Sequence, residues 1–204
     1  MGREPEIHLD FPARYELAFL ERLRPLPDSK GYARSLGFPC GGDLDPQQEL
    51  AEPPILAVRP SEGYSWIGTF RGGGVGAPPA ALTQVVGMPD EVSICVVKHG
   101  AAYIVRTDDP SSNLELDLFP VCDVLSIREQ RLVIFGDFIR LVAFGEHGQV
   151  WRSERLVLDD LKIVRAEGDV LHLSGSGIDS RTDFTVDLRS GQSPDQLYSE
   201  EWGR

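Results

Sequence analysis

The sequence predicts a mainly β fold: an antiparallel meander with open or sandwiched sheets and an irregular N-terminal arm. From residue 55 onward, short apolar runs follow one another and are separated by turns rich in Gly, Asp, Ser and Pro. Several of these runs alternate apolar and polar residues with a period of two, which is typical of strands with one buried face. The pattern is densest in residues 132–192, where strand-like segments and turns succeed one another.

The size and composition suit one globular domain. At 204 residues and 41% hydrophobic content, the chain is long enough to bury a core without help from disulfides or metals. We therefore expect a single domain over residues 1–204. It would consist of the arm (1–50), a β core (51–192) and a polar tail (193–204).

The charge argues against nucleic-acid and membrane partners. The chain has 32 acidic and 20 basic residues and a net charge of -12, and such a field repels nucleic acid and anionic membrane surfaces. The first residues lack the apolar core of a secretory leader, and no apolar run approaches the roughly 18 residues of a membrane span. We expect an acidic cytoplasmic protein.

The cysteines indicate no disulfide framework and no cofactor. Cys40, Cys95 and Cys122 form an odd set without Cys-x-x-Cys spacing, so neither a disulfide pattern nor a zinc site is predicted. Cys95 lies within the apolar run 92–97, where a small buried thiol is the expected role.

The N-terminal 50 residues contain many turn formers, and we expect them to lie over the core as an arm. One segment within the arm fits a helix or a strand. Pro12 stands where a helix would begin, and the apolar residues that start at Tyr15 end before the breaker Pro25-Leu26-Pro27. We favour the helix, and the strand stays open as the alternative.

The β core begins after Pro53-Pro54. Strands are predicted at residues 55–58, 64–70, 82–86, 92–97, 101–105, 114–118 and 121–127. Lys98-His99-Gly100 predicts a tight hairpin, and the run from Asp108 to Asn113 is a turn by composition.

The stretch 132–192 supplies the remaining strands, predicted at residues 132–135, 138–144, 156–164, 170–174 and 182–188 and around Trp151. The segment that ends at Phe144 has apolar residues on both faces and should be a central strand. The segment around Phe184 has one apolar and one polar face, so one of its faces should be solvated.

A weak internal repeat joins three of these segments. A strand followed by a similar turn occurs after Tyr103, after Leu141 and after Thr185. The spacing of these copies is close to the 40 to 50 residues of a four-stranded propeller blade. The repeat predicts a succession of blade-like units.

The second copy, Leu-Val-Ala-Phe-Gly-Glu-His-Gly-Gln-Val-Trp-Arg at residues 141–152, resembles the strand, turn and tryptophan signature of quinoprotein-type β-propeller repeats. In that family the tryptophan packs between neighbouring blades, so the resemblance implies a structural Trp151 and no cofactor. The third copy lacks the tryptophan, and Gly145 stands where the repeat usually has Asp. A closed ring needs at least four blades of about 40 to 45 residues, more than residues 51–192 supply, which favours open sheets.

Asp137 and Arg140 are the most informative charges, because they interrupt an otherwise apolar stretch. Charges in such a stretch must be paired or lie at a strand end. One interpretation is a bend at Gly136-Asp137 with Arg140 paired to an acid. The other is a pocket lined by Asp137, Arg140 and Arg152, together with His172, which we expect to be half-buried near an acid.

Trp66 lies with Tyr64 and Phe70 on one face of a predicted strand. This aromatic face fits the core, and the alternative is an exposed binding surface.

No complete catalytic constellation is present in the sequence. We expect a non-catalytic β-domain that acts through contact with a protein partner or through self-association, by a strand edge or an aromatic face. The alternative is a protein or enzyme that binds a small carboxylate or phosphate in an Arg-lined pocket. The residues assigned to binding are Asp137, Arg140, Arg152, His172 and Trp66.

Overall fold

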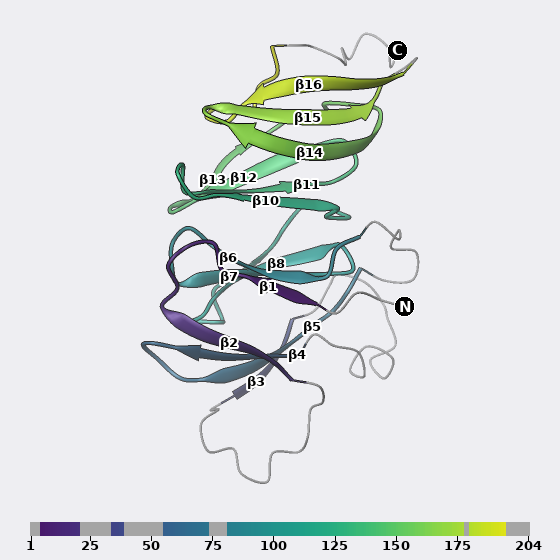
Figure 1. The fold of residues 1–204 in the computed structure, drawn as a ribbon. Helices are drawn as coiled ribbons and strands as arrows, with labels where there is room; N and C mark the ends of the chain where they lie inside the picture. Colours follow the sequence, from purple (N-terminus) through teal and green to yellow (C-terminus); the bar gives the residue numbers. More distant parts are fainter. Residues whose placement is uncertain (1–4, 21–33, 39–54, 74–80, 178–179, 195–204) are drawn as a thin grey trace. The chain divides into compact units, whose positions relative to one another are not determined.

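The computed structural model describes residues 5–20, 34–38, 55–73, 81–177 and 180–194. In these residues all regular secondary structure is β, as strands β1 to β16 in four open, mostly antiparallel sheets (Figure 1). The predicted mainly β fold with open sheets is therefore confirmed. The contacts divide the chain into two compact units, Met1–Phe119 and Pro120–Arg204, which we describe one at a time. The single domain stays a prediction.

Sheet A of the first unit has the strand order β1-β6-β7-β8-β9. Strands β6 to β9 form an antiparallel meander, and β1 adds to the edge of β6 in parallel. The strands of sheet A are β1 (Glu6–His8), β6 (Gln84–Gly87), β7 (Ser93–Lys98), β8 (Ala101–Arg106) and β9 (Asn113–Glu115).

Sheet B of the same unit has the order β2-β4-β5-β3. Its strands are β2 (Tyr15–Leu20), β3 (Arg34–Phe38), β4 (Ile55–Pro60) and β5 (Trp66–Phe70). Strand β4 pairs antiparallel with β2 and β5, and β3 pairs parallel with β5.

The favoured helix after Pro12 is wrong, because the described part of that segment is strand β2. Tyr15 is buried, Leu17 and Phe19 pack against the same core, and Glu16 and Ala18 are exposed. This alternation matches the period of a strand, and pairing with β4 satisfies the backbone groups. The N-terminal 50 residues also contribute β1 and β3 to sheets, so the arm is not irregular in these segments.

The core of the first unit lies between sheets A and B. It contains apolar side chains of both sheets, among them Tyr15, Leu56, Val58, Trp66, Phe70, Val85, Ile94, Val96, Tyr103 and Val105. The predicted aromatic face of β5 belongs to this core. The predicted hairpin between β7 and β8 is confirmed, since His99 and Gly100 both have positive φ angles, as the two central residues of a type I′ turn require.

The second unit contains sheets C and D. Sheet C is a four-stranded antiparallel meander of β10 (Asp123–Ile127), β11 (Leu132–Gly136), β12 (Leu141–Gly145) and β13 (Gly148–Arg152). Sheet D is a three-stranded antiparallel meander of β14 (Asp159–Glu167), β15 (Val170–Ser176) and β16 (Arg181–Asp187). Strand β12 is central, as predicted.

The core of the second unit lies between sheets C and D. It is formed by buried apolar residues of both sheets, among them Ile134, Leu141, Ala143, Trp151, Leu161, Leu171, Leu173, Phe184 and Val186. Phe184 and Val186 are buried, while Asp183 and Asp187 on either side of this pair are exposed. One face of β16 is therefore solvated, as predicted.

The repeated strand and turn occupy the same place in three sheets. Strand β8 is the third strand of the β6 to β9 meander, β12 is the third strand of sheet C, and β16 is the third strand of sheet D. The same strand-and-turn pattern thus recurs in three sheets. Among the described residues, a fourth antiparallel strand follows the turn only in sheets A and C.

Candidate functional site

Asp137 forms a bend at the end of β11. Its side chain is buried, and Oδ1 accepts hydrogen bonds from the backbone amides of Ile139 at 2.7 Å and Arg140 at 2.6 Å. Asp side chains satisfy backbone donors in this way in tight turns. The bend interpretation of Asp137 is therefore correct, and both of these bonds are to backbone.

Arg140 and Arg152 lie on the surface at one end of sheet C. Both residues are exposed, and Arg152 pairs in register with Val142 on β12. The link between Asp137 and Arg140 runs through the Arg140 amide, and no ion pair joins the Arg140 guanidinium to an acid within the described ranges. The expected pairing of Arg140 with an acid is not found there.

His172 lies on the face of β15 that points away from the core. Its side chain is 30% exposed, and Nε2 stands 3.7 Å from the Glu167 carboxylate on β14. The prediction of a half-buried histidine near an acid on a neighbouring strand is confirmed.

His172 does not converge with the other predicted residues of the second unit. The Asp137 bend meets sheet D where the Leu161 amide donates to the Phe138 carbonyl at 3.0 Å. His172 pairs with Arg165, which is four residues further along β14 and therefore about 13 Å away. His172 is thus at the other end of β14 from Asp137.

Trp66 is part of the first unit's core and has no exposed surface. Its indole Nε1 donates to the Thr107 carbonyl oxygen at 2.8 Å, which joins sheet B to the end of β8 in sheet A. The core interpretation of Trp66 is correct, and the exposed aromatic surface is not formed by this residue.

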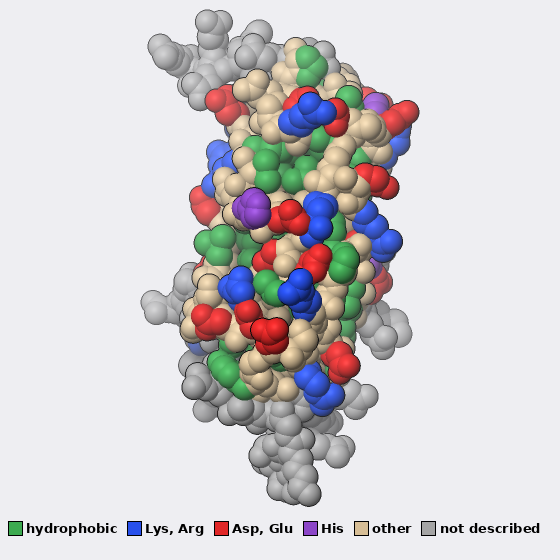
Figure 2. All heavy atoms as spheres, turned by 90° about the vertical axis from the view of Figure 1, so that its left-hand side faces the viewer, with side chains coloured by type: hydrophobic (Ala, Val, Ile, Leu, Met, Phe, Trp, Pro, Cys, Tyr) green, Lys and Arg blue, Asp and Glu red, His purple; other side chains and the backbone are tan. Residues whose placement is uncertain are grey.

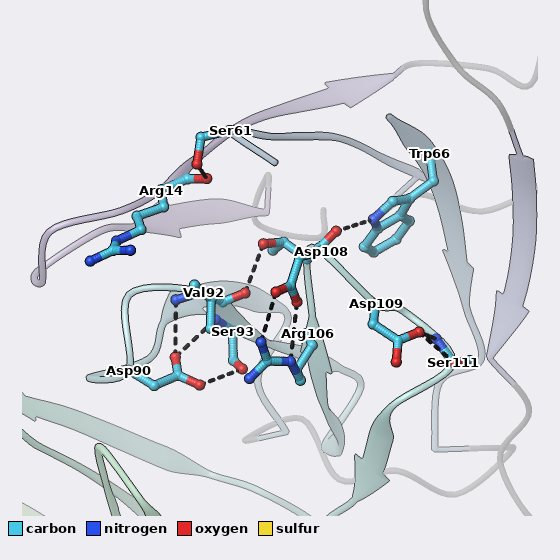
Figure 3. A network of polar contacts seen from close by, with 11 residues as sticks. Arg14, Ser61, Trp66, Asp90, Val92, Ser93, Arg106, Asp108, Asp109 and Ser111 are labelled. Carbon is cyan, nitrogen blue, oxygen red and sulfur yellow. Dashed lines mark hydrogen bonds and ion pairs between the residues drawn. The ribbon is translucent and has the colours of Figure 1, made fainter. Parts of the chain in front are cut away.

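A polar network that the sequence did not reveal lies at the ends of β7 and β8 (Figure 3). Asp90 accepts bonds from the Ser93 amide at 2.8 Å and the Ser93 hydroxyl at 2.6 Å. Arg106 forms a two-bonded ion pair with Asp108, at 3.1 and 2.7 Å, which raises the pKa of the guanidinium. These contacts close turns within one sheet, so the network stabilises the fold.

A second group that sequence reasoning missed connects sheets C and D. Asp123, the first residue of β10, accepts a hydrogen bond from the Ile163 amide on β14 at 2.7 Å. Burial raises the pKa of the Asp123 carboxyl, while the Ile163 amide and the Lys162 charge act in the opposite direction. Burial also raises the pKa of the neighbouring Cys122 thiol. A thiol with a raised pKa is a poor nucleophile, so this group is also structural.

Strand edges are the remaining candidates for binding, and three of the four edges in the second unit are obstructed. Strands β10 and β14 lie against each other, and the Ile163 amide of β14 already donates a hydrogen bond to the Asp123 carboxylate. Strand β13 pairs with β12 through a β-bulge, and its exposed residues include Arg152. Bulges and charges of this kind prevent regular pairing with a further strand.

Strand β16 is the regular edge. Its seven residues pair with β15 without a bulge, from Val170↔Asp187 to Ser176↔Arg181. The Asp187 amide donates to the Gln192 carbonyl, and the Thr185 carbonyl accepts from the Ser193 hydroxyl, so both groups point away from β15. Because direction alternates along a strand, the amide and carbonyl of Asp183 also point outward. No strand of the described residues pairs with that side.

The charges at this edge are unequal. Arg181 leans back over sheet D, where its guanidinium bonds to the Asp160 carboxylate at 2.6 Å and the Ser174 hydroxyl at 2.9 Å. Asp183 is exposed, and within the described ranges no hydrogen bond or ion pair engages its carboxylate. An acid is therefore the outermost charge beside the open backbone groups.

Neither the charges on the face in Figure 2 nor any metal-ligand group marks a centre of another kind among the described residues. On the face in Figure 2, acidic and basic side chains are interspersed rather than gathered by sign. Within the described residues, no three or more His, Cys, Asp or Glu side chains are grouped to hold a metal ion. The described part of the chain also contains no helix of the length and apolarity needed to cross a membrane.

The sequence matches no protein-family model and no curated protein.

Proposed function

We propose that this chain is a non-catalytic binding domain that recognises another protein by strand addition. A strand of the partner protein would pair with β16 at the edge of sheet D. The observation that supports this most directly is the regular, unbulged edge of β16, whose outward backbone groups at Asp183 have no partner strand among the described residues. Backbone hydrogen bonds supply affinity in strand addition, and side chains next to the edge supply specificity.

The other surfaces considered fit a binding role less well. The aromatic face around Trp66 is core, so it offers no contact area. The free face of sheet D carries ion pairs such as Arg181 with Asp160 and Arg165 with Glu167. Covering these pairs would remove charged groups from water, and their mutual attraction would offset little of that desolvation free energy. An Arg-lined pocket for a small anion is not favoured either, because Arg140 and Arg152 are exposed at one end of sheet C, while His172 lies at the other end of β14 from Asp137.

A proline at position 183 tests this function, because it removes an outward amide while leaving the β15 ladder intact. Proline is tolerated on an edge strand where its missing N–H would face solvent. The matched control is Asp183→Asn, which keeps the amide and removes the charge. We expect the tagged wild-type chain and Asp183→Asn to retain the same partner in affinity capture, and Asp183→Pro to lose it with unchanged circular dichroism and thermal unfolding.

Two outcomes would contradict the proposal. One is retention of the same partner by a folded Asp183→Pro variant, which would place the contact elsewhere. The other is a strict monomer by light scattering that captures no partner with any of the three chains.

A further inference from the structure

The edge of β16 is acidic where its outward backbone groups are open, at Asp183. The outward groups of Asp187 and the Thr185 carbonyl are bonded to residues 191–193. Asp183 is exposed and stands beside the outward backbone groups, while Arg181 on the same strand is already bound to Asp160 and Ser174. Asp187 lies on the same face as Asp183, and hydrogen bonds from Ser190 lower the pKa of its carboxyl. A strand added to β16 meets the Asp183 carboxylate on its solvent face.

The alternation of β16 sets which positions of an added strand meet which side chains. Asp183 and Asp187 point to solvent, and Phe184 and Val186 point to the core of the second unit. Residues of an added strand that lie beside Asp183 therefore also face solvent, and opposite charges in such cross-strand positions are favourable. Its alternate residues lie beside the apolar row.

A second copy of this chain is a poor occupant of this edge. Each chain carries a net charge of -12, and pairing of two β16 edges would bring four acids, Asp183 and Asp187 from each chain, to one small sheet surface. Like charges in facing positions are destabilising. Outward acids on an edge strand are also a device that keeps copies of a protein apart.

Building on the proposed function, we infer that the occupant is an extended basic segment of a different protein, with Lys or Arg on the face that meets Asp183 and β-branched or apolar residues at the alternate positions. The backbone groups of β16 around Asp183 hold the segment, and the Asp183 carboxylate selects it. The outward backbone groups and the carboxylate of Asp187 are already bonded to residues 189–192. Recognition of this kind weakens as the ionic strength rises, because the selecting charge is exposed.

The test is a selection of displayed random decapeptides on the full chain, followed by binding measurements on Asp183→Asn and Asp183→Pro. We expect enriched peptides with Lys or Arg at alternate positions. Their binding should be about 2- to 5-fold weaker to Asp183→Asn, the range expected for one cross-strand charge pair, and lost with Asp183→Pro.

The outcomes separate this inference from the function on which it rests. Enriched peptides that need the Asp183 amide but show no basic preference would overturn the basic segment and leave strand addition standing. Peptides that bind folded Asp183→Pro as well as wild type, or no enrichment at all, would overturn both. Circular dichroism of each variant establishes that it is folded before binding is compared.

Discussion

Two tryptophans make the same kind of joint in the two units. The indole of Trp66 donates to the carbonyl of Thr107 at 2.8 Å, and the indole of Trp151 donates to the carbonyl of Leu188 at 2.6 Å. Each acceptor directly follows the third strand of its meander, β8 in one case and β16 in the other. A buried indole N–H needs such an acceptor, because an unsatisfied donor in a core is costly.

The hydrogen bond of Trp151 can be separated from its packing. We expect Trp151→Phe to lower the free energy of unfolding by about 1 to 3 kcal/mol, because the Leu188 carbonyl loses its donor while most of the apolar contact remains. Trp151→Ala should cost about 3 to 5 kcal/mol through the cavity it leaves. Urea denaturation measures both, and equal effects of the two substitutions would contradict a separate role for the bond.

Gly191 is required at its position for two reasons. Its φ is +71°, and a Cβ there would lie 2.5 Å from a ring carbon of Trp151. Gly168 is the matched control, since its φ is +57° but a Cβ would meet nothing within 4 Å. We expect Gly168→Ala to cost about 1 kcal/mol from backbone strain alone and Gly191→Ala clearly more. Thermal unfolding measures both variants. Similar losses of stability would mean that the Trp151 ring moves aside at little free-energy cost.

Asp123 gives the second unit a pH dependence of defined sign. Burial raises the pKa of its carboxyl in the folded state above the unfolded value, so its contribution to stability is complete below the unfolded pKa and declines as the pH rises through the folded pKa. Asp123→Asn does not titrate and can still accept the Ile163 amide. We expect the stability of this variant relative to wild type to rise with pH from about 4 upward.

Urea denaturation at several pH values from 3 to 7 measures this difference. A difference that stays constant over the range, or falls as the pH rises, would contradict the raised pKa of Asp123.

Only part of this residue-scale detail could be predicted from the sequence. The Asp137 bend and the half-buried His172 follow from local pattern, because each is explained by neighbours in the chain or on an adjoining strand. Asp123 escaped notice because its partner, Ile163, is 40 residues away and contributes a backbone amide. The Ile163 amide is free to donate because a β-bulge interrupts the pairing of β14 with β15 there. No sequence pattern indicates such a donor.

At the scale of elements, strand positions followed from alternation, while strand neighbours did not. The apolar residues of β2 fit both a helix and a strand in isolation, with the helix favoured, and pairing with β4 decided for the strand. Strand β9 is shorter than the alternation around Leu116 suggested, because only Asn113–Glu115 pair with β8. Edges and bulges depend on pairing between distant segments, so the open edge of β16 could not be predicted.

Neighbouring residues of β16 differ in the direction of their amides, and proline distinguishes them. Leu188 donates to Asp169 beyond β15, so by alternation the Thr182 amide also points toward β15. We expect Thr182→Pro to break a ladder bond and lower the melting temperature by several degrees, and Asp183→Pro to change it little. Differential scanning calorimetry measures both. Equal losses would contradict the assigned directions.

At the scale of the whole molecule, the sequence indicated open sheets but not a division into two units. The boundary at Phe119 and Pro120 carries no long polar linker, which is the usual signal of separate units. Open sheets leave edges, and edges must be protected from like molecules. The net charge of -12 and the outward acid Asp183 of β16 oppose such pairing electrostatically.

Removal of the outward acid should therefore increase self-association. We expect Asp183→Thr, which keeps a strand-forming residue at the edge, to form dimers or larger species at concentrations where the wild type does not. Light scattering after size-exclusion chromatography measures this. Unchanged mass over the full concentration range would show that Asp183 is not needed to keep copies apart.

The fluorescence of Trp66 and Trp151 can also report on each pair of sheets separately. Indole emission shifts to longer wavelength when a buried ring becomes hydrated, and Trp66 and Trp151 each lie within one pair of sheets, A with B and C with D. In a Trp66→Phe variant, Trp151 therefore reports on sheets C and D. In a Trp151→Phe variant, Trp66 reports on sheets A and B. With Trp202 replaced in the background, the opening of each unit can be timed by its own fluorescence.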